Sequence, residues 1–103
     1  MRRGTTPTLT FTIDFDISKI VSGYITFSQN DVVILDKVIG ESGVSLSEGL
    51  LSVHLTQEET LLFKSAPVSP VKVQLRLLLE DEEAIASNII IFNAGQILKD
   101  GVI

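Results

Sequence analysis

The sequence predicts an all-β fold, an antiparallel immunoglobulin-like sandwich of six or seven strands with one short helix near residues 57–63. Apolar and polar residues alternate over several segments, which is the pattern of half-buried strands. Turn-forming residues separate these segments at regular intervals, as in β-sandwich domains. A chain of 103 residues has the length of one domain. We therefore expect a single domain over residues 1–103, with arm-like ends at 1–7 and 94–103.

The first predicted strands lie in the first third of the chain. Over residues 8–13, threonines alternate with apolar residues. We therefore expect the threonine face of this strand to be exposed to solvent and the apolar face to be buried. Residues 21–29 and 32–38 form the next two strands. Asn30 and Asp31 between them fit a tight hairpin, because both residue types tolerate the left-handed conformation. The apolar run that opens the third strand predicts that both of its faces are covered.

A helix start signal follows two further strands, one short strand over residues 44–46 and another over residues 50–55. Thr56 and Glu59 have the spacing of a capping box, in which each side chain accepts a hydrogen bond from the backbone N–H of the other residue. We expect a helix of one to two turns, through about Phe63. Its apolar residues would plug one end of the sandwich.

The strongest strand signal lies over residues 71–79, where apolar residues at every second position share one face. Before it, Pro67 and Pro70 end the helical segment. After it, the acidic residues 80–83 form a turn. Residues 84–92 then return as the last long strand, which completes the sandwich.

Charge and composition exclude several classes of function. The net charge is −5, from 8 basic and 13 acidic side chains, whereas nucleic-acid binders cluster Lys and Arg. We therefore expect no nucleic-acid partner. Hydrophobic residues make up 45% of the chain, which is rich for a small monomer. Some of this apolar surface is expected to meet another chain, in a homo-oligomer.

Targeting signals are the next question. No stretch reaches the roughly 20 apolar residues of a membrane helix, so we expect no membrane contact. The first seven residues contain a basic pair but no apolar run, so we expect no secretion by a signal peptide. The chain has no cysteine, which favours an origin inside the cell.

Three acidic or basic features are candidates for chemistry. His54 is the only histidine, and it has no second His or Cys with which to bind zinc. Asp14 and Asp16 resemble the paired carboxylates of glycosidases, but such pairs flank a large cleft. The acidic turn at residues 80–83 does not match a calcium-binding loop. We expect His54 to lie at the surface, Asp14 and Asp16 to have no glycosidase role, and the acidic turn to be exposed to solvent.

Phosphate-binding and nucleophile motifs do not occur in the sequence. We therefore predict a protein that is not an enzyme, without catalytic, cofactor-binding or metal-binding residues. An enzyme would require one cleft that holds Asp14, Asp16 and His54 together.

The C-terminal tail is a candidate subunit contact. It carries four large apolar residues, namely Ile97, Leu98, Val102 and Ile103. Two interpretations are open. The tail packs over the open end of its own domain, or it docks on a neighbouring subunit, because termini fray unless something holds them.

Several segments carry a resemblance to a known family. Residues 55–60 (LTQEET) lead to the strand 73–77 (VQLRL), and the return strand ends in residues 89–91 (III). This order resembles small immunoglobulin-like sandwich proteins encoded in prophage structural regions. Residues 4–11 (GTTPTLTF) are similar to the start of N-terminal baseplate and tail domains of phages of Gram-positive bacteria. Where those proteins have a glycine-containing turn, residues 65–70 read SAPVSP.

The resemblance implies a non-enzymatic structural subunit of a virion, in the tail, neck or baseplate. It implies a homo-oligomer that also contacts other virion proteins. It further implies synthesis in the bacterial cytoplasm and then incorporation into the virion. The alternative hypothesis is a binding module for a cell-surface glycan or protein, with a concave face lined by Tyr24 and polar neighbours.

Overall fold

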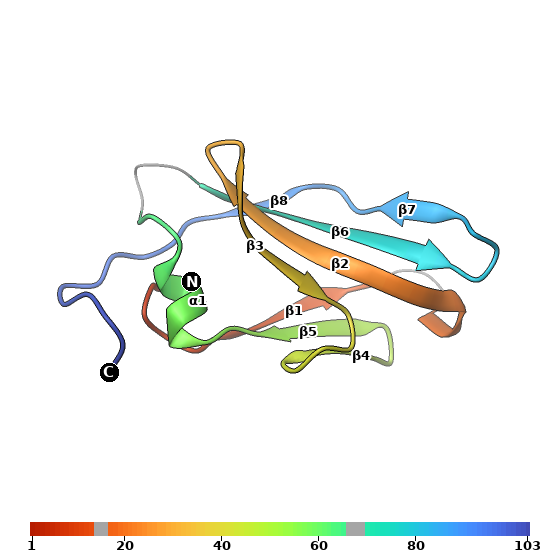
Figure 1. Cartoon of the computed structure of the whole chain (residues 1–103), viewed down its shortest axis with the longest axis horizontal. Helices are drawn as coiled ribbons and strands as arrows, with labels where there is room; N and C mark the ends of the chain where they lie inside the picture. Colours follow the sequence, from red (N-terminus) through yellow and green to blue (C-terminus); the bar gives the residue numbers. More distant parts are fainter. Residues whose placement is uncertain (14–16, 66–69) are drawn as a thin grey trace.

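The computed structural model describes residues 1–13, 17–65 and 70–103. Two antiparallel sheets lie face to face as two layers (Figure 1). The predicted all-β antiparallel sandwich is therefore confirmed. Short helical segments lie at the two ends of the sandwich.

Both sheets pair their strands antiparallel throughout. The smaller sheet has the order β1-β5-β4, with β1 (Thr8–Thr12), β4 (Val44–Ser47) and β5 (Leu50–His54). The larger sheet has the order β3-β2-β6-β7, with β8 also paired to β6. Its strands are β2 (Ile20–Gln29), β3 (Val32–Val38), β6 (Val71–Leu79), β7 (Ala84–Ala86) and β8 (Ile90–Phe92). The helices are η1 (Ile17–Lys19) and α1 (Gln57–Leu61).

The strand expected over residues 84–92 is divided into β7 and β8, so the described residues form eight strands. Ser87 causes the division. Its backbone N–H donates to the Leu75 carbonyl at 2.8 Å, while its hydroxyl accepts from the Leu75 N–H at 3.0 Å. A side chain thus replaces a backbone acceptor, and the register with β6 shifts by one residue beyond this point.

The hairpin between β2 and β3 sets the strand order. Asn30 and Asp31 have φ angles of 53° and 62°, and Gln29 pairs with Val32, as expected for a type I′ turn. A two-residue turn does not reach the other sheet, which lies about 10 Å away. As a result β2 and β3 belong to the same sheet, and β2 lies between β3 and β6. In constant immunoglobulin domains, by contrast, the second and third strands belong to different sheets.

The prediction that both faces of the third strand are covered is wrong. Val32 and Val33 are 59% and 60% exposed. The register changes between Phe27, which pairs with Leu35, and Ser28, which pairs with Val33. Ile34 is the extra residue of this β-bulge. Val33 points away from the core with Ser28, and among the described residues no further layer covers that face of the larger sheet.

The core lies between the sheets and is closed at one end by the residues after α1. Its buried members include Ile25, Phe27, Val71, Val73 and Leu77 from the larger sheet and Val44, Leu51 and Val53 from the smaller. The ring of Phe63 is buried at 5.8 Å from that of Phe27. Leu62, expected in the same plug, is 54% exposed, because neighbouring helical residues project about 100° apart.

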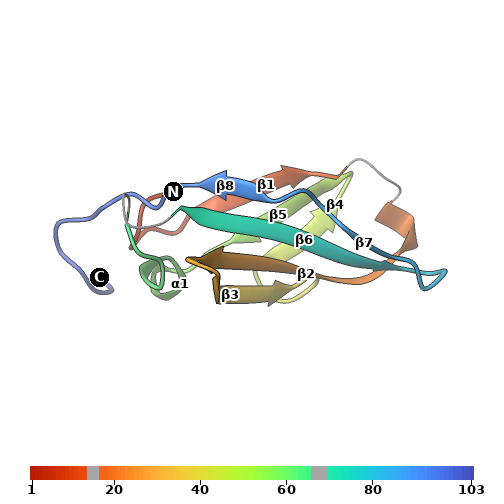
Figure 2. The ribbon, with the colours of Figure 1, turned by 90° about the horizontal axis from the view of Figure 1, so that it is seen from above.

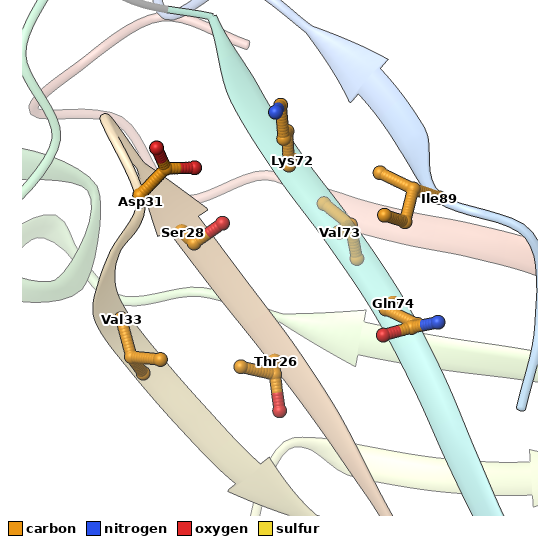
Figure 3. A pocket seen from close by; sticks show the side chains of 8 residues that line it. All are labelled: Thr26, Ser28, Asp31, Val33, Lys72, Val73, Gln74 and Ile89. Atoms are coloured by element: carbon orange, nitrogen blue, oxygen red, sulfur yellow. The ribbon is translucent and has the colours of Figure 1, made fainter.

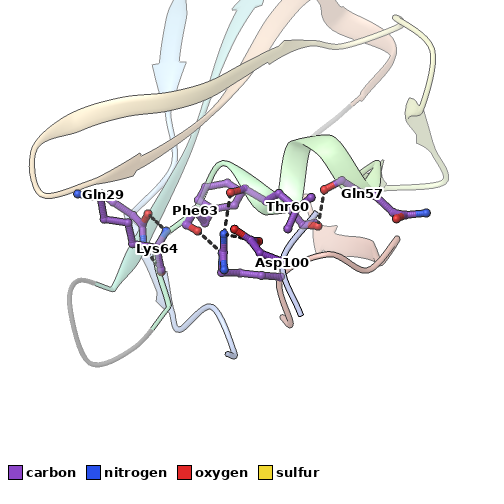
Figure 4. Close-up of polar contacts among 8 residues, drawn as sticks. Gln29, Gln57, Thr60, Phe63, Lys64 and Asp100 are labelled. Carbon is purple, nitrogen blue, oxygen red and sulfur yellow. Dashed lines mark hydrogen bonds and ion pairs between the residues drawn. The ribbon is translucent and has the colours of Figure 1, made fainter. Parts of the chain in front are cut away.

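The capping box that opens α1 is confirmed. Thr56 accepts from the Glu59 backbone N–H at 3.2 Å, and the Glu59 carboxylate accepts from the Thr56 N–H at 2.9 Å. After the helix, Lys64 and Gln29 exchange two hydrogen bonds that attach this segment to the end of β2 (Figure 4). Of the two prolines expected to end the helical segment, Pro67 lies outside the described residues.

The N-terminal residues lie beside the chain that follows β8 (Figure 2). Arg2 and Gly95 form a parallel bridge, in which the Arg3 N–H donates to the Gly95 carbonyl at 3.1 Å and the Gly95 N–H donates to the Met1 carbonyl at 2.6 Å. Ala94 is fully buried beside this bridge. Residues 1–3 of the expected N-terminal arm therefore pair with their own chain.

Candidate functional site

The outer face of the larger sheet, which we call the outer face, carries an exposed apolar surface. The face consists of the side chains that point away from the core on β2, β3, β6 and β8, and cross-strand pairing places them in rows. Tyr24 and Val33 are 49% and 60% exposed there. The other exposed apolar members are Val38, Leu78 and Ile91. Surfaces of this kind are typical of contact sites.

A trough follows the central strand β2 along this face, because Ser22, Thr26 and Ser28 of β2 are smaller than their neighbours on β3 and β6, and Tyr24 stands between its two parts. Its first hollow encloses about 340 Å³. Thr26 and Ser28 lie on its floor, Val33 on one side and Ile89 on the other (Figure 3). A second hollow of about 310 Å³ lies further along β2 beside Tyr24. We call these two hollows together the β2 trough.

Charges of opposite sign flank the β2 trough. Asp31 and Asp36 lie on the β3 side, whereas Lys72 and Arg76 lie on the β6 side, and all four are exposed. Asp31 and Lys72 both line the first hollow (Figure 3). The Thr26 hydroxyl donates to the Asp36 carboxylate at 2.8 Å, which holds that carboxylate over the face. The trough thus has an acidic and a basic wall.

The free edge of β3 is protected against pairing with another strand. Glu41 occupies the outward backbone groups of Val38: its carboxylate accepts from the Val38 N–H at 2.6 Å, and its N–H donates to the Val38 carbonyl at 3.2 Å. Lys37 points inward, where only 9% of its side chain is exposed. Inward-pointing charges and bulges are devices that block edge-to-edge association.

Lys37 forms an ion pair with Glu59 of α1 at 2.8 Å. Burial by itself would raise the pKa of Glu59. The hydrogen bond from Lys37, the hydrogen bonds from Thr56 and the positive charge of Lys37 outweigh that effect, so the pKa of Glu59 lies below its ordinary value. This pair joins the edge strand to the helix.

Of the residues considered for chemistry, the structure describes His54 and the acidic turn at residues 80–83. His54 is exposed, and its Nδ1 lies 3.0 Å from the Thr8 hydroxyl. Asp14 and Asp16 lie outside the described residues, so the structure does not test whether they approach His54. Within residues 1–13, 17–65 and 70–103, no three His, Cys, Asp or Glu side chains gather closely enough to hold a metal ion.

The acidic turn after β6 is exposed, as predicted. Glu82 adopts a φ of 65°, and its N–H donates to the Leu79 carbonyl at 3.0 Å. The Asp81 carboxylate accepts from the Glu83 N–H at 3.1 Å. The carboxylate of Asp81 therefore stabilises the turn itself.

The four apolar residues of the C-terminal tail differ in their surroundings. Ile97 is half-buried, and its Cδ1 would lie 3.0 Å from a Cβ at Gly4. Leu98 and Ile103 are fully exposed and Val102 is 56% exposed. Ile97 thus packs on its own chain, and Val102 lines a hollow beside His54 and Glu58, whereas Leu98 and Ile103 project into solvent.

The trough is a feature that the sequence analysis missed. The small polar residues Ser22, Thr26 and Ser28 on one face of β2, interrupted by Tyr24, are the signal from which a shallow groove is recognisable. The opposite charges of the two walls were not predictable from the sequence. Asp31 and Lys72 are far apart in the chain, and they line the same hollow only because the strands pair.

No helix among the described residues has the length and apolar character needed to cross a membrane. Comparisons of this chain with models of known protein families, with curated proteins and with solved structures gave no match.

Proposed function

We propose that this chain is a non-enzymatic structural subunit that acts through protein–protein contacts, in the tail, neck or baseplate of a phage or prophage virion. The observation that carries the contact role is the apolar outer face. Tyr24, Val33 and Val38 are exposed there around a shallow trough rather than a deep cleft. Burial of such a surface against another subunit is favourable by about 25 cal/mol per Å² of apolar area.

The virion assignment rests on the resemblance of residues 4–11, 55–60, 73–77 and 89–91 to prophage structural proteins. Its test is mass spectrometry of particles purified by density gradient from the source strain after prophage induction. The chain is expected in the particle band, in a fixed ratio to the major structural proteins. Recovery only outside the particles contradicts the assignment.

The contact role has a separate test in the purified chain. Sedimentation equilibrium is expected to show a mass that rises with concentration above that of a single chain. Replacement of Tyr24 and Val33 by Ser is expected to weaken this association, because it removes apolar area from the outer face. The matched control replaces Val21 and Leu62 by Ser, which are equally exposed but do not line the trough. A single-chain mass at all concentrations contradicts self-association.

A second candidate function is binding of a cell-surface glycan. The observation that favours it is the position of Tyr24, whose ring is 49% exposed beside Ser22 and Arg76 in the second hollow. Sugar rings bind to aromatic faces, and neighbouring polar groups orient them. A glycan array is expected to yield hits that Tyr24→Ala abolishes. An array without hits contradicts this candidate and leaves the first unaffected.

A further inference from the structure

All of the last six residues of the chain are exposed. Leu98 and Ile103 are fully exposed. The segment contacts its own chain through an ion pair from Asp100 to Arg3 at 3.4 Å, in which the Asp100 side chain remains 75% exposed. It also exchanges two hydrogen bonds between the Ile103 backbone and the Gln57 side chain. Removal of fully exposed apolar side chains from water by a partner lowers the free energy.

The sequence of this segment combines apolar residues with one adjacent pair of opposite charges, Lys99 and Asp100. In extended backbone, neighbouring side chains point to opposite sides. In the unbound chain the segment bends at Leu98, Lys99 and Gly101. Docking would extend it, and it would then present Lys99 on one side and Asp100 on the other. Leu98, Val102 and Ile103 supply apolar area beside this pair.

The β2 trough has the complementary arrangement. Its first hollow bears Asp31 on one wall and Lys72 on the other, with Val33 and Ile89 beside them (Figure 3). Asp36 extends the acidic wall along β3, and Arg76 extends the basic wall along β6. An occupant with a positive side chain toward β3 and a negative side chain toward β6 satisfies both walls.

We propose that residues 98–103 of one copy of this chain dock into the β2 trough of a second copy, with Lys99 toward Asp31 and Asp100 toward Lys72. This inference rests on the proposed self-association and names the surfaces that carry it. Two different surfaces meet in such a contact. A reciprocal exchange of the two segments gives a two-fold dimer, whereas a non-reciprocal contact builds closed rings or open filaments.

The test is a charge-reversal cycle in the full-length chain, read by sedimentation equilibrium at low ionic strength, where exposed charges are least screened. Lys72→Glu and Asp100→Lys each place like charges together. Each single variant is expected to lower the weight-average mass toward that of one chain. The double variant restores an opposite pair and is expected to recover the mass of the wild type.

Lys19→Glu is the matched control. It makes the same charge change in η1, away from the residues that line the β2 trough, and its mass is expected to equal that of the wild type. Thermal unfolding of each variant establishes that the domain is folded. A double variant that stays as small as the single variants, or single variants that associate like the wild type, would overturn the docking model.

A peptide of residues 96–103 provides an independent readout. Added to the ¹⁵N-labelled chain from which residues 98–103 are deleted, it is expected to shift the amide signals of Thr26, Ser28 and Gln74. Shifts confined to other surfaces contradict the docking site. A deletion variant that retains the wild-type oligomer mass also contradicts it, and points instead to two outer faces packed on each other. A wild-type chain that is monomeric at every concentration contradicts the proposed self-association as well.

Discussion

At the scale of single residues, Gly23 shows how close packing selects an amino acid in the middle of a strand. Gly23 faces the core from β2. A Cβ at this position would lie 2.5 Å from Leu77 Cδ2, 2.8 Å from Ile39 Cδ1 and 2.9 Å from the Arg76 carbonyl oxygen. Glycine weakens strand interiors and is found where another group approaches the backbone closely. Here the side chains of Leu77 and Ile39 fill the space over the glycine.

Gly23→Ala is therefore expected to destabilise the domain by about 1–3 kcal/mol, the usual cost of overpacking a core. Urea unfolding followed by circular dichroism measures the change. Gly95→Ala is the matched control, because a Cβ there meets its nearest atom at 3.4 Å, an ordinary contact. Equal losses of stability in the two variants would contradict the packing argument.

At the scale of elements, the ion pair between Lys37 and Glu59 attaches the edge strand β3 to the helix α1. Lys37 is nearly buried, and its charged group lies 2.8 Å from the Glu59 carboxylate. An unpaired charge at such a position is costly. The same carboxylate also completes the capping box of the helix. One residue thus stabilises the start of α1 and neutralises the inward charge that protects the edge of β3.

The contribution of the Lys37–Glu59 ion pair to the free energy of unfolding is expected to depend on pH. The pKa of Glu59 is lower in the folded chain than its ordinary value of 4.5, so the unfolded chain binds this proton more readily. The stabilisation is therefore fully present above about pH 4.5 and is lost as the pH falls through the folded pKa. Glu59→Gln is expected to cost about 1 kcal/mol at neutral pH, the upper range for an ion pair that solvent still reaches.

Chemical denaturation of wild type and Glu59→Gln between pH 7 and pH 3 measures this contribution. The difference between their unfolding free energies is expected to shrink in the acid range. Glu58→Gln is the control, because Glu58 lies one position earlier in α1 and is exposed. A difference that stays constant down to pH 3 would show that the carboxylate charge is not what stabilises the pair.

At the scale of the whole molecule, the N-terminal residues connect α1 with the segment after β8. Arg3 donates to the Phe63 and Leu61 carbonyls at the end of the α1 segment and to the Asp100 carboxylate (Figure 4). Its backbone N–H donates to Gly95. The last carbonyls of a helix have no partner within the helix. The Arg3 guanidinium supplies donors to two of the carbonyls here.

Arg3→Ala is expected to lower the unfolding free energy by about 1.5–3 kcal/mol, the range for hydrogen bonds from a charged donor. Guanidinium denaturation measures the loss. Arg2→Ala is the control, because Arg2 is exposed and donates to the exposed Gln96 carbonyl. Arg3→Lys is expected to recover only part of the loss, since an ammonium lacks the planar fork that reaches both carbonyls. An Arg3→Ala variant that is as stable as Arg2→Ala would contradict the stabilising role of the Arg3 guanidinium.

Local patterns in the sequence were sufficient for most of the elements. The alternation over residues 71–79, the turn at Asn30 and Asp31 and the capping box at Thr56 and Glu59 each depend on neighbours within a few positions, and all three are confirmed. The break at Ser87 was not predicted, because a serine hydroxyl competes with a backbone carbonyl only when β6 lies opposite.

The sequence by itself determined that the chain forms an antiparallel sandwich with a capped helical turn, because periodicity and turn chemistry are local properties. Only the tertiary structure decided that β2 lies between β3 and β6. That placement joins Asp31 and Lys72 across one trough and leaves the apolar start of β3 at an open edge. Cross-strand neighbours come from distant parts of the chain, so their juxtaposition arises only when the sheets pair.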